Sequence, residues 1–191
     1  MAEVVVFHSV HGVTPGVLGF AGTLEEAGHT VHVPDLFDGR VFADLEAGIA
    51  HAHEIGFDTV VERGRRAVDG LPAGCVYAGF SLGVLPAQAL AQTRPGARGA
   101  LLYSGCVPMT AFAARWPAGV PVQVHGMSDD EIFAHEGDLD AARALVACTD
   151  DGELYLYRGR AHLFADPGLP TYDPAAAQLL TVRTLRFLER I

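Results

Sequence analysis

Three residue types that together can catalyse acyl transfer occur in this sequence in a definite order. Ser81 lies within residues 79–83, which have the Gly-x-Ser-x-Gly pattern of a strained turn between a strand and a helix. An aspartate follows, and then a histidine at His162. A serine hydroxyl becomes nucleophilic when an imidazole accepts its proton, and a carboxylate can orient that imidazole. The pattern therefore predicts Ser81 as nucleophile and His162 as general base and acid.

Two neighbouring aspartates compete for the role of the carboxylate. Asp129 stands three residues after Gly126, a spacing that is frequent in such loops. Asp130 is followed by an acid and then by the apolar residues 132–133, which could anchor the loop. Either carboxylate could orient the imidazole. Position in the chain alone therefore leaves both open.

The negative charge of a tetrahedral intermediate requires hydrogen-bond donors as well. We expect one donor to be the backbone N–H of Leu82, directly after the nucleophile. The other is expected in the loop after the first strand, at the backbone N–H of Val10. His8, Ser9 and His11 flank that position and are candidate pocket residues.

The elements that must position these residues follow from apolar runs and turn signals. We expect strands over residues 4–7, 30–33, 75–78, 99–103, 121–125 and 154–157. Helices are expected over about 14–27, 58–68, 82–92, 138–147 and 174–188. Residues 35–56 show weak helical periodicity and are interpreted as an excursion near the C-terminal edge of the sheet, forming part of a pocket wall.

This alternation predicts one α/β domain over residues 1–191, with a compact, doubly wound and mostly parallel sheet. Ligands of such sheets bind beyond the carboxyl ends of the strands. Each candidate residue follows an expected strand, so all of them can meet at one edge.

Composition excludes several classes of protein. Of the 191 residues, 50% are hydrophobic and 19% are charged, which excludes a disordered chain. The 13 basic and 23 acidic residues give a net charge of −10 without any basic run, which argues against nucleic-acid or anionic-membrane partners. The sequence enters the first strand without a signal-peptide pattern and has no stretch of membrane-spanning length. We therefore predict a cytoplasmic protein.

Other residues that could do chemistry are interpreted as structural. The three cysteines, Cys75, Cys106 and Cys148, are odd in number and lie in apolar surroundings, which indicates free buried thiols. His51 and His53 lack a third ligand and are interpreted as exposed helix histidines, so no metal is expected. Trp116 and His125 are expected to be packing residues.

Segments along nearly the whole chain resemble the dienelactone hydrolase family, whose members are small α/β-hydrolases with little or no cap. The resemblance lies in residues 4–9, 12–13, 32–37, 79–83, 125–130 and 157–164. It implies hydrolysis of an ester or lactone through an acyl-enzyme, without a cofactor. It also implies a triad of Ser81, Asp130 and His162, and thus favours Asp130 over Asp129.

The sequence departs from this family at two positions. Characterised members carry a cysteine nucleophile and a glutamate from the loop after the first strand, where this chain has Ser81 and Ser9. A thiol can be held as a thiolate, whereas serine is deprotonated during attack, so the family's thiol activation cannot operate here. No motif matches the family's substrate-binding arginines, and Arg158 and Arg160 are candidates because they lie close to His162 in sequence.

Two other functions fit the same sequence. A non-catalytic protein that binds a small molecule could have this fold, because a fold does not fix a function. A thioesterase or peptidase would differ only in the leaving group. A small-molecule ester or lactone is the expected substrate, and a homo-oligomer is compatible with the sequence.

Overall fold

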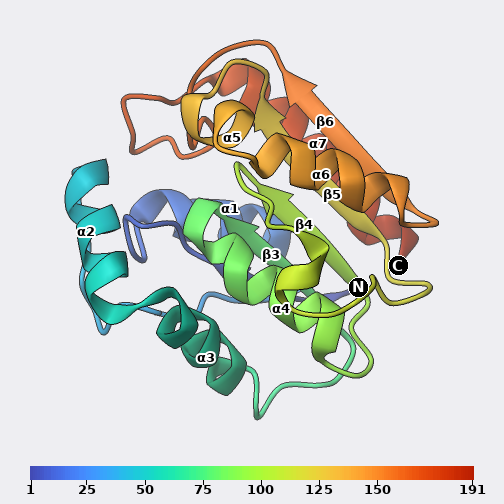
Figure 1. Ribbon diagram of the computed structural model, residues 1–191. Helices are drawn as coiled ribbons and strands as arrows, with labels where there is room; N and C mark the ends of the chain where they lie inside the picture. Colours follow the sequence, from blue (N-terminus) through green and yellow to red (C-terminus); the bar gives the residue numbers. More distant parts are fainter.

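The computed structural model describes residues 1–191 and is organised around one six-stranded sheet (Figure 1). Its strands run in the order β2-β1-β3-β4-β5-β6, and every neighbouring pair is parallel. This confirms the predicted doubly wound α/β architecture. The strands are β1 (Glu3–Phe7), β2 (Thr30–His32), β3 (Cys75–Phe80), β4 (Gly99–Tyr103), β5 (Val122–Met127) and β6 (Gly152–Tyr157).

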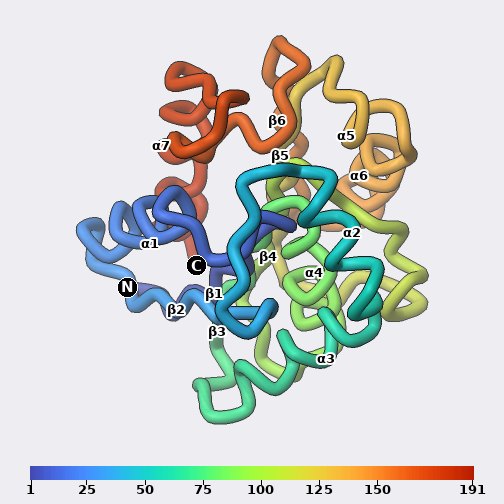
Figure 2. The backbone as a smooth tube through the Cα atoms, turned by 90° about the vertical axis from the view of Figure 1, so that its left-hand side faces the viewer, coloured from blue at the N-terminus to red at the C-terminus, as the bar shows by residue number.

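Helices cover both faces of the sheet, as Figure 2 shows. One face carries α1 (Pro15–Glu26) and α7 (Pro174–Arg190), while the other carries α3 (Phe57–Ala67), α4 (Val84–Thr93) and α6 (Asp138–Ala147). Alternate residues of β1, β3 and β4 enter the two cores, because successive side chains of a strand point to opposite faces of the sheet. The near-continuous apolar runs in the sequence therefore reflect strands that are buried on both faces of the sheet.

Two further helices lie at the C-terminal edge of the strands. α2 (Leu45–Ile55) occupies the segment expected to be a loose excursion, and its start is capped by Asp44, whose Oδ1 accepts a hydrogen bond of 2.9 Å from the Ala47 N–H. α5 (Glu131–His135) is a short helix that the sequence pattern does not predict. The expected helix after Ser81 begins with a 3-10 turn over Ser81–Gly83 before α4.

The strand order creates a crevice between the loops after β1 and β3. The chain leaves β1 towards β2 on one side, whereas β3 leads to β4 on the other side. Loops that diverge in this way open a ligand site beyond the strand ends. Residues 8–12 and Ser81 are thereby brought to the same crevice.

The thiols differ from expectation at one position. Cys75 and Cys106 are free and buried, as predicted, but Cys148 is exposed. It directly follows the last residue of α6, where the chain turns back towards β6 and faces solvent.

None of the helices has the length and apolar character that a membrane span requires.

Candidate active site

Ser81 occupies a strained turn directly after β3. Its φ is +50°, a left-handed conformation that is unusual for a residue with a side chain. A Cβ on Gly79 would lie 2.1 Å from the Gly83 carbonyl oxygen, and one on Gly83 would lie 2.4 Å from the Phe7 carbonyl oxygen. Glycine is thus needed at both positions for strand and helix to approach each other.

A chain of two hydrogen-bond contacts links three side chains at this edge. His162 Nε2 lies 2.9 Å from Ser81 Oγ, and His162 Nδ1 lies 2.7 Å from Asp130 Oδ2. Both Asp130 and His162 are buried, whereas Asp129 is exposed and its carboxylate accepts a hydrogen bond from the Ser128 hydroxyl. The structure therefore brings Asp130, and not Asp129, to His162.

The short helix α5 fixes the Asp130 carboxylate. Its Oδ1 accepts a hydrogen bond of 3.0 Å from the Ile132 N–H, which makes Asp130 the N-cap of α5. Phe133 is fully buried against β5, where a Cβ on Gly126 would meet its ring at 2.2 Å. Phe133, one of the two apolar residues of this segment, thus anchors the loop.

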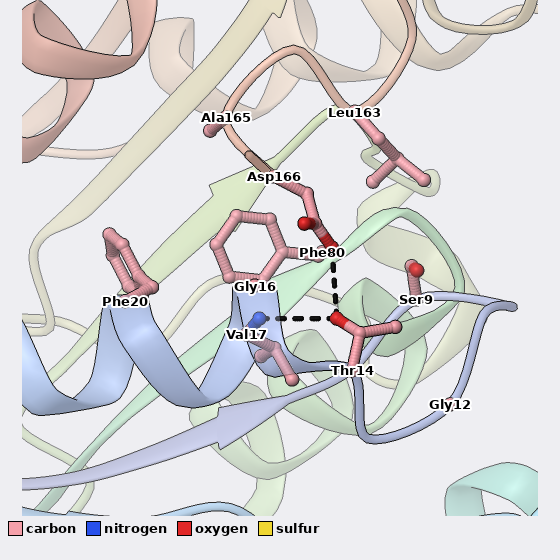
Figure 3. A pocket seen from close by; sticks show the side chains of 10 residues that line it. All are labelled: Ser9, Gly12, Thr14, Gly16, Val17, Phe20, Phe80, Leu163, Ala165 and Asp166. Atoms are coloured by element: carbon pink, nitrogen blue, oxygen red, sulfur yellow. Dashed lines mark hydrogen bonds between the residues drawn. The ribbon is translucent and has the colours of Figure 1, made fainter. Parts of the chain in front are cut away.

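The loop that carries His162 is tied to the start of α1 (Figure 3). Asp166 Oδ2 accepts a hydrogen bond of 2.9 Å from Thr14 Oγ1, and that hydroxyl in turn accepts one of 3.2 Å from the Val17 N–H. Gly16 lies so close to Asp166 that a Cβ would overlap the carboxylate. The loop after β6 is therefore anchored four residues beyond His162.

His8 braces the loop after β1 and does not face the crevice. The Leu36 N–H donates to His8 Nε2 at 2.9 Å, so the proton lies on Nδ1, which donates to the Ser9 carbonyl oxygen at 2.7 Å. Burial lowers the pKa of His8 and favours this neutral form. The expectation that His8 lines a pocket is wrong, because the ring is fully buried.

The Val10 amide is held in this loop with its donor free. Ser9 Oγ accepts from the His11 N–H at 3.2 Å and the Ser9 carbonyl accepts from the Gly12 N–H at 3.1 Å, while the Val10 N–H donates to no other atom of the chain. Helix α2 packs against the loop so closely that a Cβ on Gly48 would lie 2.3 Å from the Val10 carbonyl oxygen.

Two hollows meet at His162. The first has a volume of about 150 Å³ and opens beside Ser81. It is lined by Val10, Leu45, Ile49, Ala52, Phe57, Ser81, Leu82, Ile132 and His162. The expectation that residues 35–56 form a pocket wall is therefore confirmed. We call this space the acyl hollow.

The second hollow has a volume of about 240 Å³ and reaches His162 but not Ser81. It is lined by His11, Ala43, Asp44, Leu45, His162, Leu163, Leu169, Pro170 and Thr171. His11 is thus a pocket residue, and its Nδ1 contacts the Phe42 carbonyl oxygen at 2.7 Å. Ser9 lines a separate, small hollow against Thr14 and Phe80 (Figure 3).

The structure corrects two other expectations. Arg158 and Arg160 are exposed and line neither hollow, because β6 ends with their guanidinium groups in solvent. His51 is expected to be exposed, but it is buried. Its ring packs against that of Phe37, with 4.9 Å between the ring centroids. No group of three His, Cys, Asp or Glu side chains could hold a metal ion.

Trp116 and His125 are packing residues, as predicted. Trp116 Nε1 donates to the Val120 carbonyl oxygen at 2.6 Å. His125 is fully buried between Tyr157 and Gln123, with contacts of 2.8 and 3.1 Å, and burial lowers its pKa to about 3. Its imidazole therefore stays neutral in the folded protein at ordinary pH.

Comparison with known proteins places this chain in a family. The sequence profile described as "Dienelactone hydrolase family" matches residues 1–191. The chain belongs to the dienelactone hydrolase family. It is thus a carboxylic ester hydrolase, the class of enzyme that cleaves esters or lactones.

Relatives of this dienelactone hydrolase family member include a carboxymethylenebutenolidase from Rhodococcus opacus, 26% identical over 98% of this chain and 80% of that protein. A dienelactone hydrolase-like promiscuous phosphotriesterase from metagenomic libraries superposes with a TM-score of 0.75 at 20% identity, over 100% and 86% of the two chains. Esterase 2 of Thermogutta terrifontis, phosphoramylated by tabun, gives a TM-score of 0.68 at 16% identity, over 99% and 83%. The two structural similarities support the shared fold.

Proposed function

We propose that this protein is a serine hydrolase that cleaves a small ester or lactone through an acyl-enzyme on Ser81, without a cofactor. The observation that carries the proposal is the continuous contact from Asp130 through His162 to Ser81. It lies at the switch-point crevice, where a ligand can reach the serine.

The chemistry follows from the positions of the protons. His162 Nδ1 donates to Asp130, which leaves Nε2 free to accept the Ser81 proton as Oγ attacks the carbonyl carbon. The C–O bond to the leaving group then breaks, and the imidazolium returns the proton to the departing oxygen. Water, deprotonated by His162, attacks the acyl-enzyme and releases the acid and free Ser81.

The oxyanion is proposed to bind the backbone N–H groups of Leu82 and Val10. Both residues line the acyl hollow with Ser81, and the Val10 donor has no competing partner. Loss of one such donor typically costs about 3 kcal/mol of barrier. The network around His8 and Ser9 keeps that donor in place.

A fluorophosphonate probe and p-nitrophenyl acetate test the proposal. The wild-type protein should be labelled on Ser81 and should hydrolyse the ester, whereas Ser81→Ala should lose both properties. Ser128→Ala, a serine next to Asp129 that does not contact His162, is the matched control and should keep both. Turnover that persists in Ser81→Ala would refute the proposal.

A non-catalytic binder is the alternative from another class. It would bind small esters without turnover, and its affinity would persist in Ser81→Ala. Thioesters and peptides, assayed beside oxygen esters, separate the thioesterase and peptidase alternatives. A cytoplasmic location and a homo-oligomeric state stay predictions.

A further inference from the structure

We propose that the acyl hollow selects uncharged, apolar acyl groups and rejects acyl groups that carry a carboxylate. This inference rests on the proposed function, because it names the substrate class of the same serine. The selection depends on the residues that form the walls of the hollow, and the contacts among Ser81, His162 and Asp130 do not determine those residues.

The acyl hollow is the side of the crevice that must receive the acyl group. It contains Ser81, which would bond the acyl carbon, and both Val10 and Leu82, whose amides would bind the carbonyl oxygen. The second hollow reaches His162 without touching Ser81, so it suits the leaving group that receives the histidine's proton. The two halves of an ester therefore have separate spaces.

The walls of the acyl hollow are apolar. Leu45, Ile49 and Ala52 come from α2, Phe57 begins α3, and Ile132 lies in the first turn of α5. Phe57 is 46% exposed although it is a large aromatic residue. An exposed aromatic side chain at the rim of a hollow that contains the nucleophile is suited to contact an apolar ligand.

No cation faces this space. His162 is the only titratable residue in the lining of the acyl hollow, and no lysine or arginine belongs to it. Arg158 and Arg160, the arginines closest to His162 in sequence, are exposed and lie outside both hollows. A carboxylate bound there would lose water without gaining a partner, which strongly disfavours its ionised form. The net charge of −10 adds repulsion at long range.

The size of the hollow limits the acyl group. Its volume is about 150 Å³. An apolar cavity of roughly that volume holds one benzene molecule. We therefore expect acyl groups up to about the size of benzoyl to bind well.

A matched pair of esters tests the proposal: 4-nitrophenyl benzoate and its 4-carboxybenzoate analogue, which share one leaving group. We expect kcat/KM to be at least about 100-fold higher for the benzoate, consistent with a charge buried without a partner. Ile49→Arg places a cation in the wall and should reduce this ratio at least tenfold. Leu18→Arg makes the same charge change on an exposed position of α1 and should leave the ratio unchanged.

Phe57→Arg places a cation at the exposed rim of the same hollow and should also reduce this ratio, so it tests the site if Ile49→Arg does not fold. Equal or faster hydrolysis of the carboxybenzoate by the wild-type protein would overturn this inference and leave the serine hydrolase intact. Absence of turnover for every ester would instead refute the proposed function. The two failures are thus distinguishable.

Discussion

His162 Nδ1 lies 2.7 Å from Asp130 Oδ2, while the adjacent carboxylate of Asp129 faces solvent. Asp130→Asn should therefore lower kcat by about 10³ to 10⁴-fold, because the amide no longer fixes the imidazole tautomer. Asp129→Asn should change kcat by less than about twofold, as expected for a solvated surface carboxylate. Initial rates with p-nitrophenyl acetate measure both. A large loss in Asp129→Asn with an active Asp130→Asn would reverse the assignment.

Gly48 sets the distance between α2 and the loop that holds the Val10 amide. Gly48→Ala would place a methyl group 2.3 Å from the Val10 carbonyl oxygen and must displace the loop. We expect kcat to fall by about 10 to 100-fold, because the proposed oxyanion donor at Val10 would be partly lost. Gly19→Ala, on α1 with no atom within 4 Å of the new Cβ, is the control. It should keep full activity and gain about 0.5–1 kcal/mol of stability, since alanine favours helices.

The contact between Thr14 and Asp166 anchors the His162 loop. Thr14→Val removes both the hydrogen bond to Asp166 and the cap of α1, so we expect a loss of about 1–2 kcal/mol in the free energy of unfolding. The rate should also fall, because the loop with His162 is released. Thr14→Ser retains the hydroxyl and should restore both properties. Urea unfolding and ester hydrolysis on the same preparations make the comparison, and an unaltered rate in Thr14→Val would show that the anchor does not position His162.

Burial of His125 predicts that the fold weakens in acid. Its pKa is about 3 in the folded protein and 6.5 ordinarily, so the unfolded chain binds the proton first. Its contribution to stability is fully present above pH 6.5 and is lost as pH falls from about 6.5 towards 3, by up to about 1.4 kcal/mol per pH unit. His8, whose pKa burial also lowers, acts in the same direction.

His125→Gln removes this titration and should flatten the pH dependence of the unfolding free energy between about pH 6 and pH 4, the upper part of that window. Urea unfolding at several pH values measures the slope. The slope, and not the absolute stability, is the relevant quantity, because the variant also loses the contacts to Tyr157 and Gln123. An unchanged slope would mean that His125 is not the responsible group.

The sequence predicts the sheet, most helices and the members of the Ser81 contact chain because each has a local signal. Apolar runs mark the buried strands, and Gly79 and Gly83 mark the tight turn. The resemblance favours Asp130 over Asp129, and the structure adds the physical reason: one carboxylate oxygen of Asp130 caps α5 while the other contacts His162.

What the sequence does not predict depends on contacts between distant segments. Thr14 is recognisable as a helix cap, but its partner Asp166 lies 152 residues away and no local pattern connects them. Likewise, Gly48 is unfavourable in a helix when judged from the sequence alone. Its reason is the close approach of the Val10 carbonyl, which leaves no room for a side chain. The exposure of Arg158 and Arg160 also depends on the tertiary structure, because proximity to His162 in sequence does not determine where a guanidinium group points.

The thiols have a practical consequence. Cys148 is exposed just after α6, and the turn into β6 places it at the end of the sheet opposite Ser81. Cys75 and Cys106 are buried, and burial raises the pKa of each thiol, that of Cys106 to about 12. A maleimide should therefore attach at one position, away from the crevice, and the labelled protein should keep its ester turnover. Fluorophores or solid supports can thus be coupled to the wild-type protein without introducing a cysteine.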